Sequence, residues 1–196
     1  MNAATDKPIV IFASGQGSNA AAIIAYFKKA GGARVALIVS NKADAGVLEL
    51  AAREAIPFLI IDRETFKGAL LTEQLQELEP ALIVLAGFLW KIPPGLIGRF
   101  AGKIVNIHPA LLPAYGGKGM WGHHVHGAVL AAGEAQSGIT IHAVNEQYDE
   151  GAILLQARCA VLPGDDADAL AARVLKLEHY YYPRAIEAML QGLQAQ

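Results

Sequence analysis

Short apolar runs alternate with amphipathic stretches along the first half of the chain. These runs are rich in β-branched residues and lack the polar alternation of a strand that has one face in water. The pattern predicts strands buried on both faces and joined by helices, and therefore an α/β fold around a parallel sheet. The predicted strands are 9–13, 35–39, 58–61, 81–86 and 103–107, and the predicted helices are 19–30, 45–55, 64–79 and 94–100.

Beyond Pro109 the pattern changes. Glycine and proline become frequent, and the two apolar runs that follow are separated by only a short polar turn. Such a short connection allows antiparallel pairing but not a parallel crossover. We therefore expect a mostly parallel central sheet with an antiparallel edge and helices on both faces. The expected elements are a loop at 111–122, a helix at 124–132, strands at 138–144 and 153–161, and a final helix at 165–191 bent at Pro183.

The composition is that of a folded, weakly charged chain. Hydrophobic residues make up 54% and charged residues 17% of the 196 residues, the reverse of the balance in a disordered chain. The formal net charge of −2 gives no support for nucleic-acid binding. Residues 1–7 lack the layout of a signal peptide, the longest apolar run (81–90) is too short to span a bilayer, and Cys159 is the one cysteine. We expect residues 1–196 to form a single cytoplasmic domain, with neither nucleic acid nor a membrane as its partner.

A glycine-rich turn joins the first predicted strand to the first predicted helix. Its glycines let backbone N–H groups approach an anion, and the helix N-terminus adds a partial positive charge. Ser18 and Asn19 add side-chain donors or cap the helix. Three interpretations remain open: a capped turn, a dinucleotide site, and a site for a phosphate monoester at Gly17, Ser18 and Asn19. The dinucleotide interpretation lacks the carboxylate that such a site needs after the second strand.

A polar cluster follows the last predicted parallel strand. Asn106 and His108 are two residues apart, so they share one side of an extended chain. Ligands of open α/β sheets bind beyond the carboxyl ends of the strands, where an amide and an imidazole could stabilise a developing oxyanion. Asp149, in the polar turn, would raise the pKa of His108 if it lay close. The alternatives are a structural histidine, a capping asparagine and an ordinary turn aspartate.

Several motifs carry a resemblance to a known family. They lie at 15–19 (Gly-Gln-Gly-Ser-Asn), 40–44, 85–88, 106–113 (Asn-Ile-His-Pro-Ala-Leu-Leu-Pro) and 148–151. In this order they resemble the 10-formyltetrahydrofolate-dependent phosphoribosylglycinamide formyltransferases, up to Glu178 and His179. Asn-x-His-Pro with Leu-Leu-Pro is typical of folate formyltransferases, and Gly-x-Gly-Ser-Asn narrows the resemblance to the glycinamide ribonucleotide branch.

The resemblance implies a Rossmann-like formyltransferase fold and a reaction. That reaction is transfer of a formyl group from 10-formyltetrahydrofolate, a cosubstrate, to the amine of glycinamide ribonucleotide (GAR) in purine synthesis, without a metal. We expect the chain to act on these small molecules as a monomer or homodimer. The implied residues are Asn106, His108 and Asp149 for catalysis, Gly17, Ser18, Asn19 and Glu178 for GAR, and Arg63, Leu89, Trp90, Lys91, Ile92, Asn106, Asn145 and Glu146 for the folate.

Other interpretations remain beside this one. Trp90 and Lys91 depart from the family, in which many members carry an arginine at this point. His123, His124 and His126 could bind a metal, although the loop offers no cysteine. A formyltetrahydrofolate hydrolase would use the same catalytic side chains with water as the acceptor. A nucleotide-binding module without catalysis is the alternative from a different class.

Overall fold

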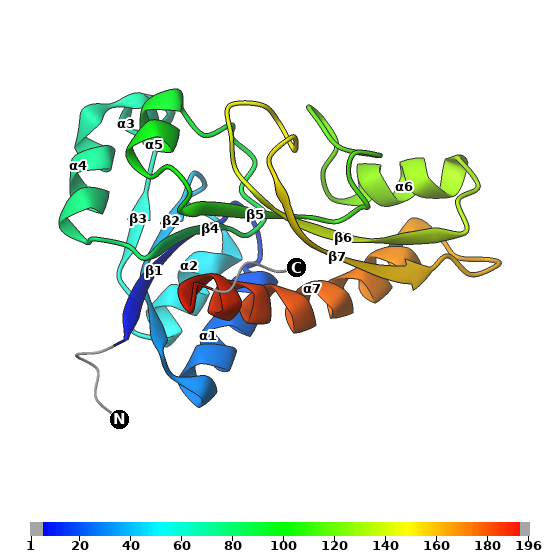
Figure 1. The fold of residues 1–196 in the computed structure, drawn as a ribbon, viewed down its shortest axis with the longest axis horizontal. Helices are drawn as coiled ribbons and strands as arrows, with labels where there is room; N and C mark the ends of the chain where they lie inside the picture. The colour runs from blue at the N-terminus through cyan, green and yellow to red at the C-terminus, as the bar shows by residue number, and fades with distance from the viewer. Residues whose placement is uncertain (1–5, 193–196) are drawn as a thin grey trace.

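The computed structural model describes residues 6–192 and contains a seven-stranded sheet with helices on both faces (Figure 1). The strand order is β3-β2-β1-β4-β5-β6-β7; the first five strands pair in parallel, and β6 and β7 are antiparallel. This confirms the predicted mixed α/β fold. The elements are β1 (Lys7–Phe12), α1 (Ser18–Ala30), β2 (Ala33–Ser40), α2 (Gly46–Arg53), β3 (Phe58–Ile60), α3 (Arg63–Lys67), α4 (Ala69–Glu77), β4 (Leu82–Leu85), α5 (Pro94–Arg99), β5 (Ile104–His108), α6 (His123–Ala131), β6 (Gln136–Ala143), β7 (Ile153–Ala160) and α7 (Ala167–Leu190).

Two hydrophobic cores lie on the two faces of the sheet. Ile9 and Ile11 of β1 pack into the core that includes residues of α1, α2 and α7. Val10 and Phe12 of the same strand point the other way, into the core that includes residues of α3, α4 and α5. Figure 1 shows these helices on opposite sides of the strands. A strand between two cores has no wet face, which explains its continuous apolar sequence.

One helix boundary was predicted wrongly. The expected helix 64–79 is divided at Gly68 into α3 and α4. Gly68 has an extended backbone (ψ 160°), and its N–H donates to the carbonyl of Glu64 to close α3. Glycine is a poor helix former, which favours the break at this residue. By contrast, α7 continues through Pro183 as one helix.

Helix α7 packs against the same face of the sheet as α1 and is hydrogen-bonded to it. The Tyr182 hydroxyl is fully buried and lies 2.9 Å from the carbonyl oxygen of Leu85 and 3.2 Å from that of Val105. One turn earlier, Glu178 faces α1. Tyr180, two residues before Tyr182, is 53% exposed.

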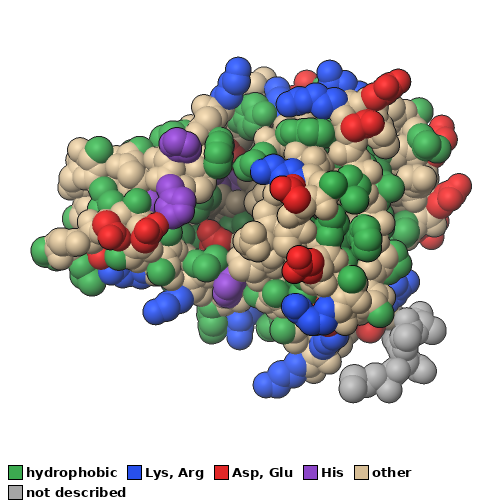
Figure 2. Space-filling model, turned by 180° about the vertical axis from the view of Figure 1, so that it is seen from behind, with side chains coloured by type: hydrophobic (Ala, Val, Ile, Leu, Met, Phe, Trp, Pro, Cys, Tyr) green, Lys and Arg blue, Asp and Glu red, His purple; other side chains and the backbone are tan. Residues whose placement is uncertain are grey.

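The topology has a switch point between two inner strands, where open α/β sheets leave a crevice beyond the carboxyl ends. The chain winds outward from β1 to β3 and then crosses back to β4, so the winding direction reverses between the neighbours β1 and β4. Ligands bind at such switch points, beyond the carboxyl ends of the strands. Figure 2 shows a hollow on one face of the molecule with histidine side chains beside it. No helix within residues 6–192 combines the length and the apolar character needed to cross a membrane.

Candidate active site

Asn106 and His108 lie at the carboxyl end of β5 and project to the same side. Ile107, between them, turns away into the core beside α7. The antiparallel strand β6 places His142 directly opposite Asn106. The Asn106 amide nitrogen Nδ2 is 3.1 Å from His142 Nε2, and His108 is only 4% exposed. Strand alternation and register together therefore gather these polar side chains in one place.

Asp149 reaches this cluster from the turn after β6. Its Oδ2 atom is 3.6 Å from His108 Nδ1, and its Oδ1 atom is 3.6 Å from His142 Nε2. The structure therefore brings together the three side chains expected to be catalytic. Asn106 bonds to a side chain and caps no helix, and Asp149 faces two imidazoles, so a capping asparagine and an ordinary turn aspartate do not describe this arrangement.

The hydrogen-bond partners fix which nitrogen of each imidazole carries a proton. His108 Nε2 is 2.7 Å from the carbonyl oxygen of Tyr115, which can only accept, so Nε2 donates. The free position of His108 is then Nδ1, on the side of Asp149. In the same way His142 Nδ1 donates to the carbonyl of Ala143 at 3.0 Å; with the proton on Nδ1, Nε2 accepts from the Asn106 amide. This bond uses one N–H of the Asn106 amide and leaves the second N–H available to donate to a ligand.

Asp149 does act to raise the pKa of His108, as expected, but it does not decide the net shift. Burial lowers the pKa of His108 and outweighs the opposing effects of the Asp149 carboxylate and the Tyr115 carbonyl, so the pKa lies below its ordinary value. Burial by itself raises the pKa of the Asp149 carboxyl, but the two imidazoles and the N–H of Gly117 lower it below its usual range. The resting site therefore pairs a neutral His108 with a charged Asp149.

His142 was not identified from the sequence, although a signal was present. Thr140 and His142 are two residues apart in a strand whose intervening residues are apolar, the same spacing that singled out Asn106 and His108. Thr140 accepts from the N–H of Leu112 and donates to the carbonyl of Ala110, which holds the chain after His108. What the sequence did not reveal was the register that sets His142 against Asn106.

The glycine-rich loop (residues 111–122) is tied to the site. The N–H of Gly117 donates to Asp149 Oδ2 at 2.9 Å, and Asp149 itself has a left-handed backbone (φ 56°). Gly116 leaves no space for a side chain, since an added Cβ would lie 2.6 Å from Leu112 Cδ2. Gly151 is more restricted still, because its Cβ would lie 1.6 Å from the carbonyl oxygen of Ala143. The turn that carries Asp149 is therefore held closely against β6.

The first glycine-rich turn (residues 14–19, called the phosphate loop here after the ligand expected from the sequence) opens α1 with a glycine at the N-cap. Gly17 has φ 81°, and an added Cβ would lie 2.8 Å from Val47 side-chain atoms. The expectation that Ser18 or Asn19 caps the helix was wrong, because Gly17 fills that position and no side-chain cap forms. The Asn19 amide instead donates to Glu178 at 2.5 Å. Gly17, Ser18 and Asn19 thus lie at the N-terminus of α1, and Glu178 reaches them there from α7.

Two observations in this region suit a polar ligand. The Asn19 Oδ1 atom is buried without a hydrogen-bond partner. Burial raises the pKa of the Glu178 carboxyl above its ordinary value, more than the Asn19 amide lowers it. Buried polar atoms without partners are uncommon, so a ligand that donates to Asn19 would complete the site.

A pocket of about 600 Å³ contains most of the residues expected to bind the folate. The Arg63 guanidinium lies 4.7 Å from the centre of the Trp90 ring, and Lys91 Nζ lies 5.6 Å from that of Tyr148. Asn145 does not line this pocket, because its side chain accepts from the N–H of Gln147 within the turn. Asn106 belongs to the catalytic cluster. The expected residues that do line the pocket are Arg63, Leu89, Trp90, Lys91, Ile92 and Glu146.

The histidines of α6 do not assemble a metal site among the described residues. His123 pairs with Asp168 at 3.1 Å on the surface, and His124 lies edge-on to Trp121 with ring centres 5.2 Å apart. His126 is buried with Nδ1 unpartnered. Within residues 6–192 no three His, Cys, Asp or Glu side chains come together in a way that could hold an ion.

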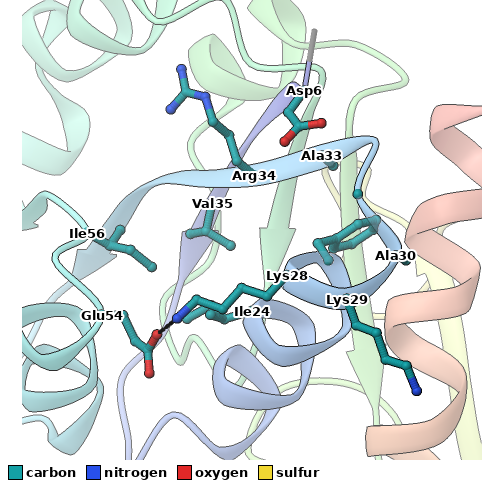
Figure 3. A pocket seen from close by; sticks show the side chains of 12 residues that line it. Asp6, Ile24, Lys28, Lys29, Ala30, Ala33, Arg34, Val35, Glu54 and Ile56 are labelled. Atoms are coloured by element: carbon teal, nitrogen blue, oxygen red, sulfur yellow. Dashed lines mark hydrogen bonds and ion pairs between the residues drawn. The ribbon is translucent and has the colours of Figure 1, made fainter. Parts of the chain in front are cut away.

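A further hollow, of about 400 Å³, lies at the opposite end of the strands from the candidate site, between the end of α1 and the start of β2 (Figure 3). Lys28 forms an ion pair with Glu54 across it, and Arg34 and Lys29 stand at its rim. Apolar side chains such as Ile24 and Val35 form its floor. None of the expected site residues lines this hollow, so it is separate from the candidate active site.

The chain is similar over nearly its whole length to one protein family and to several of its named members. The formyl transferase family matches residues 7–186. A chloroplastic phosphoribosylglycinamide formyltransferase of Vigna unguiculata is 42% identical, over 94% of this chain and 61% of that protein. A phosphoribosylglycinamide formyltransferase of Haemophilus influenzae is 38% identical, over 95% of this chain and 88% of that protein. Glycinamide ribonucleotide transformylase 1 from Symbiobacterium toebii has 34% identity and a TM-score of 0.88, covering 96% and 90% of the two chains.

These matches include all seven strands, the phosphate loop and the polar cluster. The chain spans less than two thirds of the plant relative, at 61% of its length, but most of the bacterial one. Since the fold, the order of the motifs and the matched residues agree, the chain belongs to the formyl transferase family.

Proposed function

We propose that the protein transfers the formyl group of 10-formyltetrahydrofolate to the amine of GAR, giving formyl-GAR and tetrahydrofolate in purine synthesis. The observation that carries this proposal is the position of the catalytic cluster. Asn106, His108 and Asp149 converge beyond the carboxyl end of β5, at the same end of the sheet as the phosphate loop that follows β1, with β4 between the two strands. The relatives named for this activity support the same substrates.

The two substrates are proposed to meet at the crevice between β1 and β4. Backbone N–H groups at Gly17, Ser18 and Asn19 would hold the ribonucleotide phosphate, helped by the partial positive charge of α1. Glu178 would contact the ribonucleotide from α7. The folate would lie in the pocket behind residues 89–92, where Arg63 and Lys91 suit its carboxylates.

The chemistry follows from the resting state of the cluster. The amine of GAR attacks the formyl carbon, a C–N bond forms, and the formyl oxygen gains negative charge. The free N–H of Asn106 donates to this oxygen. The neutral His108 takes the proton of the attacking amine at Nδ1, where the Asp149 carboxylate stabilises the resulting cation. His108 then gives the proton to N10 of the folate as the C–N10 bond breaks, so no covalent enzyme intermediate is needed.

The proposal has a direct test in the release of tetrahydrofolate from 10-formyltetrahydrofolate, followed by absorbance. We expect release that requires GAR and is accompanied by formyl-GAR. Ribose 5-phosphate, which lacks the amine, and glycinamide, which lacks the phosphate, are the matched controls and should support little release. Release that ignores the amine would favour the hydrolase, and no release under any condition would favour a binding module.

The pH dependence of kcat tests the role given to His108. Because its pKa lies below the ordinary value, the ring is neutral at neutral pH and available as a base. With both substrates saturating, kcat should be level from about pH 7 to 8 and fall below about pH 6, as the ring becomes protonated before the reaction. A kcat that instead rises on going from pH 7.5 to 6 would mean that a charged His108 is needed from the start.

The setting of this activity is part of the same proposal. Both substrates are free small molecules, which suits action in the cytoplasm without a membrane or nucleic-acid partner. The single cysteine, half-buried Cys159, suits a reducing compartment. We propose that the enzyme acts as a monomer or homodimer, which sedimentation of the purified protein would decide.

A further inference from the structure

Ser14 stands at the end of β1, directly before the glycines of the phosphate loop, and is only 3% exposed. Its hydroxyl donates to Asn41 Oδ1 at 2.6 Å and accepts from the backbone N–H of Leu89 at 3.0 Å. Its own N–H donates to the carbonyl of Gly87 at 3.1 Å. The hydroxyl and the backbone N–H of Ser14 therefore both bond to other segments of the chain.

These bonds join three segments that follow three neighbouring strands. Asn41 comes after β2, the phosphate loop continues from Ser14 after β1, and residues 87–92 come after β4. The last of these segments begins one wall of the proposed folate pocket, at Leu89. A single buried hydroxyl therefore connects the loop proposed to hold the ribonucleotide with the wall proposed to hold the folate.

The bonds of Ser14 lie where they can set the distance between two loops of the candidate site. Since the winding direction reverses between β1 and β4, the loops after these two strands leave the sheet toward different layers and the crevice opens between them. Gly87 has φ 73°, so the chain turns sharply where it leaves β4. Two bonds to Ser14, one on each side of Phe88, set where residues 87–89 lie relative to the phosphate loop.

We propose that Ser14 is a positioning residue that sets the separation of the two substrate-binding loops. This inference rests on the proposed function, since it concerns how the two substrates are placed for reaction. The amine must approach the formyl carbon to about 3–3.5 Å, and a misplacement of about 1 Å can cost about 10²-fold in rate. The hydroxyl touches neither substrate; it acts by holding Leu89 and Asn41 in place.

The test is Ser14→Ala, with Ser40→Ala as the matched control. Ser40 is also buried, but its hydroxyl bonds only within its own turn, to the backbone of Lys42. We expect Ser14→Ala to lower kcat by about 10- to 100-fold while the Kd for GAR alone stays within about twofold. Asn41→Ala, which leaves the Leu89 bond intact, should lower kcat less. Ser40→Ala should change kcat little, although it should change Tm by about as much as Ser14→Ala does.

A binding-independent readout separates this inference from the proposed function. In the ligand-free protein, hydrogen exchange at the Leu89 amide should become faster in Ser14→Ala and stay unchanged in Ser40→Ala. If the wild-type enzyme showed no GAR-dependent release of tetrahydrofolate, the proposed function would be contradicted. The role of Ser14 is tested separately, by the ratio of the variant's kcat to the wild-type kcat and by hydrogen exchange at the Leu89 amide. It is overturned if Ser14→Ala keeps kcat within twofold, if Ser40→Ala loses as much kcat, or if Leu89 exchange does not change.

Discussion

His108→Ala is expected to lower kcat by at least about 10²–10³-fold, because it removes the base that takes the proton of the attacking amine and gives it to N10. The Kd for GAR should change little, since the phosphate loop lies on another strand. Stopped-flow absorbance of tetrahydrofolate release, with both substrates saturating, measures kcat directly, and calorimetry measures the Kd. Asn106→Ala is expected to give a loss of similar order, because it removes the side-chain donor to the developing oxyanion.

The matched control is His123→Ala. His123 is also a histidine paired with a carboxylate, but both it and Asp168 are exposed, with 72% and 82% of their side-chain surfaces accessible. We expect this variant to keep wild-type turnover within about twofold, since an exposed pair contributes little to folding. Near-normal turnover in both His108→Ala and Asn106→Ala would contradict the assignment of the cluster. Equal losses in the control would point to a general loss of structure.

Gly151→Ala is expected to have the largest effect on folding. The added Cβ would lie 1.6 Å from the carbonyl oxygen of Ala143, and neither can rotate away, because the carbonyl is part of the backbone and the Cβ is bonded directly to it. Relief requires separating β6 from the turn and breaking the bond from the N–H of Ala143 to the carbonyl of Ala152. Overpacking of this kind costs about 3 kcal/mol or more. In a chain of this size that cost lowers Tm by about 6–12 °C.

Calorimetric melting of the variant tests this, and activity should fall with it because Asp149 is two residues away. Gly98→Ala is the control: Gly98 is exposed in α5, an added Cβ there meets no atom within 4 Å, and alanine is the better helix former. We expect Gly98→Ala to be neutral or slightly stabilising. A Gly151→Ala protein that melts like the wild type would mean that the turn lies farther from β6.

Most of the fold could be predicted because its signals are local. Runs such as the one in β1 are apolar on both faces, which predicts a strand between two layers of helix before any contact is known. The missed break at Gly68 shows the limit of that reasoning. A single glycine is tolerated in many helices, and the carbonyls that it contacts decide whether the helix continues.

The candidate site was only partly predictable. Spacing alone placed Asn106 and His108 on one side of a strand, whereas the contact between Asn106 and His142 depends on antiparallel register, which no local pattern contains. The net direction of the His108 pKa shift could not be predicted, for a related reason. The attraction of one aspartate could be anticipated, but the burial that outweighs it comes from packing of the whole molecule.

The left-handed backbone of Asp149 decides which substitution can isolate its charge. Aspartate and asparagine are among the few residues with a side chain that adopt this conformation readily. In Asp149→Asn the side chain keeps its shape and can still accept from Gly117, so a change in turnover reports the lost charge. An alanine in the same place would also force a conformation it disfavours by about 1 kcal/mol or more, and electrostatics and strain would then be mixed in one number.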